Sequence, residues 1–309
     1  MIRLSGLNKT YGEFAAVDHL SLEIVKGETF AFLGPNGSGK TTTLKCIVGL
    51  TTPDEGDIWV QGMHIHEDAR EVRRRISYLP QRVSFHDNLT AREVLGFYCR
   101  LRRIPAQRIE EVLTRTRFNF NGFADKPVSN LSGGMIQRLG LAVACLPDTP
   151  VLILDEPMVN LDPEGAIYFR EFLGSLRRQG KTVVFSSHIL ADVELLADRV
   201  AILVGGQLVA VESIESLREG VLQSSKMRLT LDNPDPGWIA AARAAGAEDV
   251  ATEGNTLVIT SPPEKRLQIL HAVESSGGRI LRFATQEPSL EDIYLRYTHG
   301  PNQQVVRKG

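Results

Sequence analysis

Residues 34–41 form a glycine-rich loop with the sequence GPNGSGKT. The loop follows an apolar stretch at residues 28–33 and precedes a stretch with helical character at residues 40–50. A glycine-rich turn between a strand and a helix directs backbone N–H groups at phosphate oxygens, and the lysine adds a positive charge. The loop therefore predicts a nucleoside triphosphate site within an α/β fold.

The positions of this loop have expected roles. Backbone N–H groups of the turn and of the helix N-terminus bind phosphate oxygens, Lys40 places its charge toward the β- and γ-phosphates, and the Thr41 hydroxyl faces Mg²⁺. A coincidental glycine turn is the alternative interpretation, and the strand-to-helix context argues against it. The residues expected to bind nucleotide here are Asn36, Gly37, Ser38, Gly39, Lys40, Thr41 and Thr42.

Two acidic residues follow another apolar stretch. Asp155 and Glu156 come directly after residues 151–154, which read VLIL. Doubly wound sheets bind ligands at the carboxyl ends of their strands, so this pair is expected beside the phosphates. We expect Asp155 to hold Mg²⁺, directly or through water, and Glu156 to act as the general base on the attacking water. A solvated strand end is the alternative, but the pair completes a phosphoryl-transfer set.

Short β-rich stretches alternate with helical ones from residue 1 to about residue 212, the pattern of a parallel sheet covered by helices. Residues 182–186 are a further expected strand. Residues 90–117 carry helical apolar spacing without strand signals, and residues 136–146 read as another helix. We therefore expect an α/β domain over residues 1–212, with a helical subdomain inserted at about residues 83–146.

The sequence pattern changes after residue 212. Residues 213–225 are expected to be a linker with a short helix, and the polar tail at residues 300–309 is expected to be mobile. Between them, residues 226–299 predict a small α+β domain of the split β-α-β, ferredoxin-like type. Its expected strands are residues 226–231, 256–260 and 279–284, its helices are residues 236–245 and 264–275, and residues 250–252 are expected to pair with residues 256–260.

A second glycine motif, LSGGM, occupies residues 131–135. Together with the loop at residues 34–41 and the acids after residue 154, it makes the chain resemble the ATP-binding subunit of an ABC transporter, over residues 2–211. In that family this motif is the signature, and it faces the γ-phosphate held by the other subunit. The resemblance thus implies that Ser132, Gly133 and Gly134 bind nucleotide across a dimer interface.

The resemblance also assigns roles to four single residues. Tyr11 is expected to stack on adenine, Gln81 to link Mg²⁺ and the lytic water to the membrane partner, Asp162 to contact the second subunit, and His188 to sense the γ-phosphate. Taken alone, each has a plainer interpretation: surface packing, a loop amide, a helix N-cap before Pro163, and a polar strand end. Their order along the chain favours the family assignment.

Two positions after the acids depart from the family pattern. Met158 stands where threonine is usual, and Asn160 stands where glycine, serine or alanine is usual. Neither replaces a group expected to touch the triphosphate. The departures bear on the geometry of the dimer contact and on the rate of ATP hydrolysis. Glu156 and His188 are both present, so a homodimer is expected to have two competent sites.

The resemblance implies an ATPase, dependent on ATP and Mg²⁺, that pairs with a second copy or a paralogous subunit and drives transport through a separate polytopic membrane permease. The expected location is the cytoplasmic face of the inner membrane. The C-terminal unit and the ending at residues 288–294 resemble ATPases of ABC-2 type exporters, and more narrowly the ATPase of nitrous-oxide reductase maturation. The alternatives are an importer ATPase and an ABC ATPase that acts on ribosomes or DNA. ABC ATPases that act on ribosomes or DNA usually carry two ATPase domains or a long coiled coil.

Composition narrows these expectations. A net charge of −2 and a pI near 6.4 argue against a strongly basic surface, so no nucleic-acid partner is expected. No apolar stretch approaches the ~20 residues of a spanning helix. Three scattered cysteines are typical of buried thiols in a reducing compartment. The pair His64 and His66, with His86 downstream, lacks a known ligand spacing, so a metal site is disfavoured.

Overall fold

The computed structural model of the chain describes residues 1–115, 123–159, 161–223, 226–232 and 235–286. The chain separates into two compact units, Met1–Glu212 and Ser213–Gly309. Asn160, the ending at residues 288–294 and the tail at residues 300–309 lie outside the described residues. Each unit is built around its own apolar core, so the two are treated separately below.

Six strands in the described part of the first unit form a sheet with the order β10-β9-β3-β8-β7-β6. The pairs β9–β3, β3–β8, β8–β7 and β7–β6 are parallel. Every residue of β3, β7 and β8 is buried, because helices and a second sheet cover both faces and leave no room for polar alternation. The strands are β3 (Thr29–Leu33), β6 (Ile76–Leu79), β7 (Val151–Leu154), β8 (Thr182–Ser187), β9 (Arg199–Val204) and β10 (Gln207–Ser213).

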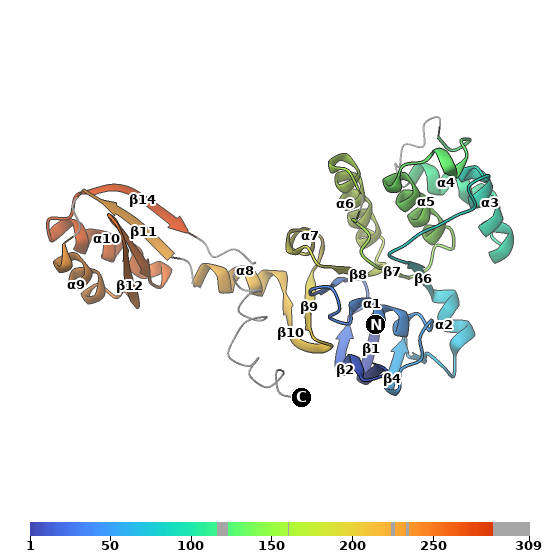
Figure 1. The fold of residues 1–309 in the computed structure, drawn as a ribbon, viewed down its shortest axis with the longest axis horizontal. Coiled ribbons are helices and arrows are strands. Elements are labelled where there is room, and N and C mark those ends of the chain that lie inside the picture. Colours follow the sequence, from blue (N-terminus) through green and yellow to red (C-terminus); the bar gives the residue numbers. More distant parts are fainter. Residues whose placement is uncertain (116–122, 160, 224–225, 233–234, 287–309) are drawn as a thin grey trace. The chain divides into compact units, whose positions relative to one another are not determined.

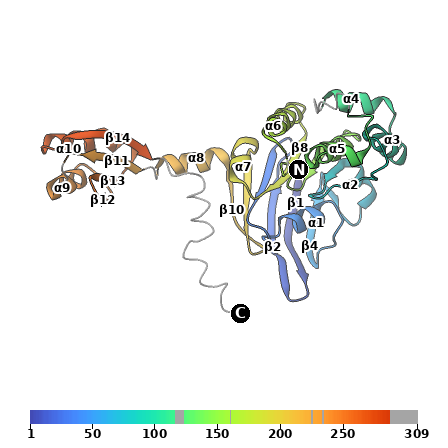
Figure 2. The same ribbon diagram turned by 45° about the horizontal axis from the view of Figure 1, so that its top comes forward.

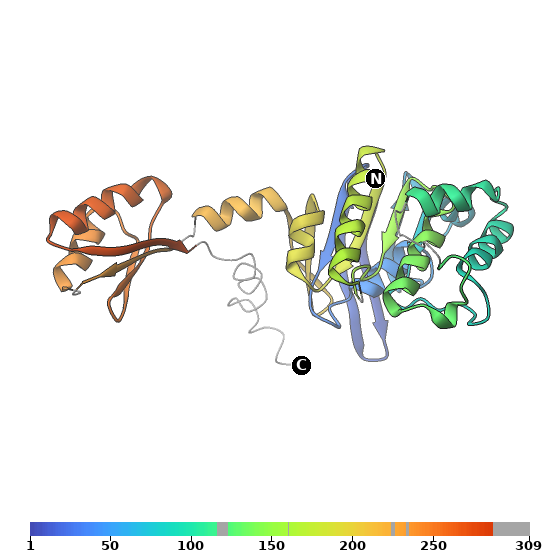
Figure 3. The same ribbon diagram turned by 90° about the horizontal axis from the view of Figure 1, so that it is seen from above.

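Helices lie on both faces of this sheet. On one face are α6 (Pro163–Arg178) and α7 (Leu190–Leu196), and on the other is α1 (Lys40–Ile47), as Figure 1 shows. In the view from above, α6 lies in front of the central strands (Figure 3). The helix expected at residues 40–50 ends earlier, because Gly49 takes a left-handed conformation with φ +70°.

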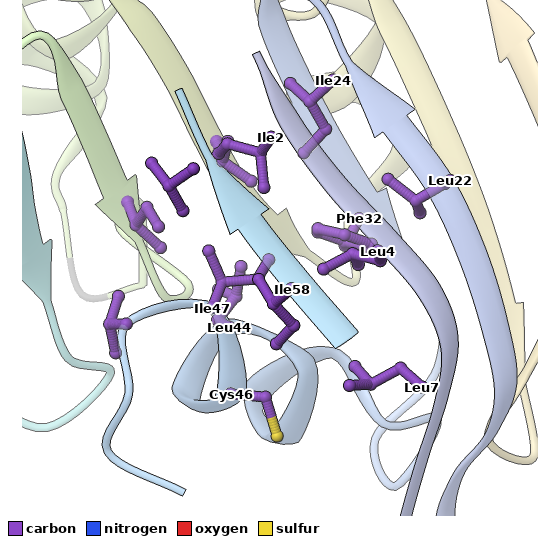
Figure 4. Packing of buried hydrophobic residues seen from close by; sticks show 14 of the residues in the cluster. Ile2, Leu4, Leu7, Leu22, Ile24, Phe32, Leu44, Cys46, Ile47 and Ile58 are labelled. Atoms are coloured by element: carbon purple, nitrogen blue, oxygen red, sulfur yellow. The ribbon is translucent and has the colours of Figure 1, made fainter. Parts of the chain in front are cut away.

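A second, antiparallel sheet of order β2-β1-β4-β5 was not expected from the sequence. Its strands alternate buried and exposed residues, as β2 does, because one face packs on the core and the other meets water. Helix α1 packs between the two sheets, and Figure 4 shows apolar side chains of β1, β4 and α1 meeting in that space. The strands of this sheet are β1 (Ile2–Tyr11), β2 (Phe14–Ile24), β4 (Glu55–Val60) and β5 (Met63–His64), and the helix α2 (Ala69–Arg75) follows β5 in the chain.

The helices α3 (Ala91–Arg102), α4 (Gln107–Arg115) and α5 (Gly133–Cys145) lie together as a group (Figure 2). Thr90 and Glu93 form a capping box at the start of α3, which fixes the entry into this group. The helical spacing at residues 90–117 breaks into two helices because Arg103 is left-handed, with φ +56°, and Pro105 follows it. A short 3₁₀ turn, Val128–Asn130, leads into α5, which begins three residues before the expected helix.

The second unit has the strand order β12-β13-β11-β14, and each neighbouring pair is antiparallel. The chain order β-α-β-β-α-β with this strand order is the ferredoxin-like arrangement, which confirms the expected fold class. The predicted hairpin is present, since β12 pairs with β13. The elements are α8 (Ile214–Gln223), β11 (Lys226–Leu231), α9 (Pro236–Ala244), β12 (Asp249–Glu253), β13 (Thr256–Thr260), a 3₁₀ turn (Pro263–Lys265), α10 (Arg266–Ser275) and β14 (Ile280–Gln286).

The expectation of buried cysteine thiols holds for two of the three cysteines. Cys46 and Cys99 are buried, and burial raises the pKa of the Cys46 thiol to about 11. Cys145 is only partly buried, because it lies at the end of α5. His64 is 3.2 Å from a carboxylate oxygen of Asp57, and its ring meets that of His66 edge to face. Within the described residues, no group of three or more His, Cys, Asp or Glu side chains is placed to hold a metal ion.

The core of the second unit gives a direct test of its packing. Leu229 of β11 is fully buried, so Leu229→Ala is expected to lower the free energy of unfolding of this unit by about 2–5 kcal/mol. Leu267 of α10 is 70% exposed, and Leu267→Ala should change that free energy by less than about 0.5 kcal/mol. In a Trp59→Phe background, urea unfolding followed by Trp238 fluorescence reports this unit. Equal losses in the two variants would contradict the packing described.

Candidate active site

The loop at residues 34–39 connects β3 directly to α1. Gly39 is the N-cap residue of α1 and is left-handed, with φ +95°. A Cβ at this position would stand 2.3 Å from the carbonyl oxygen of Ala16, so backbone conformation and space both require glycine. The Ser38 hydroxyl is buried and has no hydrogen-bond partner in the described structure. A buried donor that faces a glycine-rich turn suits a phosphate oxygen.

Lys40 is folded back into the loop and is almost fully buried. Its Nζ donates to the carbonyl oxygens of Gly34, at 2.7 Å, and of Pro35, at 3.1 Å. Burial lowers the pKa of Lys40, and the carboxylates of Glu156 and Asp155 oppose that shift. The lysine therefore lies inside the phosphate loop and beside the acid pair.

The acid pair stands at the carboxyl end of β7, where Asp155 and Glu156 are both buried. Asp155 Oδ1 accepts a hydrogen bond from the Thr41 hydroxyl at 2.9 Å and another from the Ser186 hydroxyl at 2.7 Å. The backbone N–H of Glu156 donates to the same Ser186 oxygen at 2.8 Å. The start of α1, the residues that follow β7, and β8 thus contribute to one hydrogen-bonded cluster.

The Glu156 carboxylate lies between two basic groups. Its Oε1 is 3.7 Å from Lys40 Nζ, and its Oε2 is 3.0 Å from His188 Nδ1. Glu156 has a left-handed backbone, with φ +47°, which is strained for a residue with a side chain. The structure therefore brings together Lys40, Thr41, Asp155, Glu156 and His188, as the sequence predicted for one site.

The residues around Asp155 suit a divalent cation. Thr41 and Asp155 offer oxygen atoms, the ligands that Mg²⁺ prefers. Asp155 Oδ2 is buried without a hydrogen-bond partner in the described residues, so this oxygen remains available for an ion or its water. The donor set therefore fits Mg²⁺.

The second glycine motif is built on a helix start. Ser132 is the N-cap of α5, and its hydroxyl accepts from the Met135 backbone N–H. Ser132 and Gly133 are exposed. No hydrogen bond or ion pair between described residues joins this turn to the loop at residues 34–41 of the same chain. Among the described residues, the two glycine segments are therefore not joined by a hydrogen bond or ion pair within a single copy.

The remaining predicted residues have the following positions. Asp162 caps α6 through the Gly165 N–H and pairs with Arg138 of α5 at 2.8 Å, so its plainer interpretation as an N-cap holds. Gln81 is exposed two residues after β6, and no described hydrogen bond joins it to the acids. Tyr11, at the end of β1, is 51% exposed. The loop positions Asn36 and Gly37 are exposed, and Thr42 is partly buried in α1.

Sequence reasoning missed three side chains near the acids. Ser186 carried a signal only as the last residue of an expected strand. Burial, with Asp155 nearby, raises the pKa of the Tyr78 hydroxyl of β6. Burial also raises the pKa of Asp192 in α7, which lines a small cavity with Glu156 and Ser186. Their role depends on which strands are neighbours, and this is not visible in a linear pattern.

Sequence comparison places the chain among known proteins. Residues 17–159 match the family described as "ABC transporter", and residues 213–298 match "ATP-binding protein DrrA1-3-like, C-terminal domain". The Nod factor export ATP-binding protein I of Rhizobium etli is 34% identical over 302 residues, covering 96% of this chain and 93% of that protein. This chain belongs to the ATP-binding proteins of ABC transporters. The mouse ATP-binding cassette sub-family A member 7 is 32% identical over 294 residues, covering 92% of this chain and 14% of that protein.

Solved ABC transporter cassettes share the fold. A structure titled as the ATP binding subunit of an ABC transporter has a TM-score of 0.64 and 26% identity, covering 71% of this chain and 92% of that one. The dimeric structure of a bacterial ABC transporter cassette has a TM-score of 0.64 and 28% identity, with coverages of 69% and 99%. A post-hydrolysis state bound to ADP and Pi has a TM-score of 0.62 and 29% identity, with coverages of 69% and 99%.

The family assignment made from the sequence is confirmed, and so is the enzyme class. The protein is an ATP-hydrolysing subunit of an ABC transporter. The narrower likeness to the ATPase of nitrous-oxide reductase maturation is not tested by these relatives and stays a prediction. Among the described residues, no helix has both the length and the apolar character needed to cross a membrane.

The fit of Gly39 against Ala16 can be measured. Gly39→Ala and Gly37→Ala both place a side chain at a positive φ, which costs about 1–2 kcal/mol. Only Gly39→Ala adds a clash with backbone, whereas a Cβ at Gly37 meets open space. We expect Gly39→Ala to lower the free energy of unfolding of the ATPase unit by about 1–3 kcal/mol more than Gly37→Ala. In a Trp238→Phe background, urea unfolding followed by Trp59 fluorescence measures the difference, and equal losses would refute the clash.

Proposed function

We propose that this ABC ATPase powers export through a separate polytopic membrane protein, working as a pair of identical copies that bind Mg-ATP between them. The observation that carries the proposal is the position of Glu156, buried at the end of β7 between Lys40 and His188. A general base must lie within reach of the attacking water, which in phosphoryl transfer stands beside the γ-phosphate and the charges that hold it. Glu156 meets this requirement.

The phosphate-binding residues act through charge and positioning. The N–H groups of residues 36–42 surround the phosphates, and Lys40 leaves its carbonyl partners to contact the β- and γ-phosphate oxygens. Thr41 and Asp155 would hold Mg²⁺, which would supply positive charge to the phosphoryl oxygens during transfer. Tyr11, exposed at the end of β1, stacks on the adenine ring.

The remaining assigned residues act at the γ-phosphate. Glu156 accepts a proton from the attacking water, and His188 contacts the γ-phosphate while its Nδ1 holds the Glu156 carboxylate. Gln81, at the same edge of the sheet as Asp155, links Mg²⁺ and the lytic water to the membrane partner. Its exposure in this structure suits a residue that also meets another chain.

A second copy completes each site. Ser132, Gly133 and Gly134 present a hydroxyl and backbone N–H groups at the start of α5, and within one chain they bind no part of the phosphate loop. In a pair of copies, this turn faces the γ-phosphate held by the other copy, and Asp162 contacts that copy. ATP then favours the closed pair because these contacts exist only in the closed state. The dimeric solved cassette supports this arrangement.

Export and a membrane partner are supported by the named relatives. The Nod factor export ATP-binding proteins of several Rhizobium species match 96% of this chain, including its second unit. The chain therefore works at the cytoplasmic face of the inner membrane, held there by its permease. Affinity purification of the tagged chain from its native membranes, followed by mass spectrometry, tests this proposal. Recovery of a polytopic membrane protein is expected, whereas recovery of ribosomes or DNA instead would overturn it.

The role of Glu156 gives a sharp kinetic prediction. Glu156→Gln removes the proton acceptor but keeps the volume, so the rate of ATP hydrolysis is expected to fall by about 10²–10⁴-fold while ATP still binds. Because ATP is then retained, size-exclusion chromatography should show a dimer that depends on ATP. Glu23→Gln, on the exposed face of β2, is the control and should hydrolyse ATP at the wild-type rate. Retained turnover in Glu156→Gln would contradict the general-base role.

A further inference from the structure

We infer that Ser186 is a positioning residue for ATP hydrolysis, which holds the metal-binding carboxylate of Asp155 and the backbone of the general base Glu156 in one geometry. The inference rests on the proposed function, because the roles of the two acids are part of it. Ser186 itself touches neither the phosphates nor the attacking water. It acts through the two acids.

The hydrogen bonds of Ser186 have a fixed direction. The residue is on β8, which is parallel to β7, and its side chain is fully buried. Its Oγ accepts the Glu156 N–H at 2.8 Å, and it lies 2.7 Å from Asp155 Oδ1. An ionised carboxylate can only accept, so the single hydroxyl proton of Ser186 must point at Asp155. Both the donor and the acceptor of this hydroxyl are therefore committed to the acid pair.

The first consequence concerns the orientation of Asp155. Oδ1 receives two hydrogen bonds, one from Ser186 and one from Thr41, whereas Oδ2 is buried and has none in the described structure. The χ2 angle of aspartate is intrinsically soft, so the plane of the carboxylate is set by these donors. Two donors on one oxygen leave the other oxygen available to hold a cation. Without Ser186, Oδ1 keeps only the Thr41 hydrogen bond among the described residues.

The second consequence concerns the backbone of Glu156. Its φ of +47° is unfavourable for a residue with a Cβ, and such a conformation persists only where neighbouring groups hold it. The Ser186 hydroxyl is the acceptor for the Glu156 N–H. This bond fixes the peptide from which the Glu156 side chain extends toward Lys40 and His188.

The chain contains a matched control for this inference. Ser77 of β6 is also a buried serine in the same sheet, and its hydroxyl accepts a hydrogen bond from the Thr149 hydroxyl at 2.9 Å. Its bonds do not involve the acid pair. Ser186→Ala and Ser77→Ala thus delete the same atom from similarly buried sites, and only the first deletion loosens Asp155 and Glu156.

The experiment compares kinetics with Mg²⁺ dependence in the full-length protein. We expect Ser186→Ala to lower kcat about ten- to a hundredfold, while the KM for ATP stays within about threefold, because small misplacement of reacting groups costs rate more than binding. Calorimetry should show unchanged ATP affinity in EDTA and a smaller gain in affinity on adding Mg²⁺. Ser77→Ala should change none of these. If Ser186→Ala does not fold, Ser186→Cys keeps a side chain of similar shape, weakens both hydrogen bonds and should show the same kinetic pattern.

The outcomes separate this inference from the proposed function. If wild-type protein hydrolyses ATP, Glu156→Gln does not, and Ser186→Ala matches Ser77→Ala, the positioning role is wrong and the proposed function stands. If the foldable Ser186 variant loses ATP affinity in EDTA as well as rate, its effect is structural and the inference is overturned. If Glu156→Gln hydrolyses ATP normally, the proposed function itself fails.

Discussion

The register of the parallel strands is the constraint on which the rest of the site depends. Leu33 at the end of β3 pairs with Ser187 of β8, and Leu154 at the end of β7 pairs with Phe185 of the same strand. The three strands therefore end at nearly the same level. A glycine loop, an acid pair and a serine–histidine segment, separated widely in sequence, meet there because each follows directly from a buried strand. A shift of register in β7 would separate the acids from both partners.

Burial of the charged side chains at this edge of the sheet determines which partners they need. Lys40, Asp155 and Glu156 are charged groups with little access to water, and such groups are stable only when paired. In this structure they are paired with one another, with His188 and with neutral donors from the chain. In the function that we propose, a triphosphate with its cation replaces these pairs, and the low-dielectric surroundings strengthen each new contact. The site is thus held in order by contacts that nucleotide can exchange.

The sequence predicted the parts of the fold that follow from local patterns. Uniformly apolar strands, the helix after the glycine loop and the β-α-β-β-α-β order of the second unit were all readable from periodicity and turns. The antiparallel sheet was missed because its strands alternate along the chain with strands of the parallel sheet, so the sequence pattern does not show that they belong to a separate sheet. The break at Arg103 could have been predicted from Pro105, whereas the positive φ of Glu156 has no signal in the local sequence pattern. Ser186 was missed for the same reason: its importance comes from the strand beside it.

The ion pair between Arg138 and Asp162 joins two segments with different duties in the same copy. Arg138 lies in the helix that starts at the signature turn, and Asp162 lies a few residues beyond Glu156. Through this ion pair, a displacement of that helix bears on Asp162, which follows the proposed general base Glu156 in the sequence. In the closed pair that we propose, communication between the two nucleotides therefore has a short mechanical route, from the turn that meets one triphosphate to the general base that activates the water beside the other.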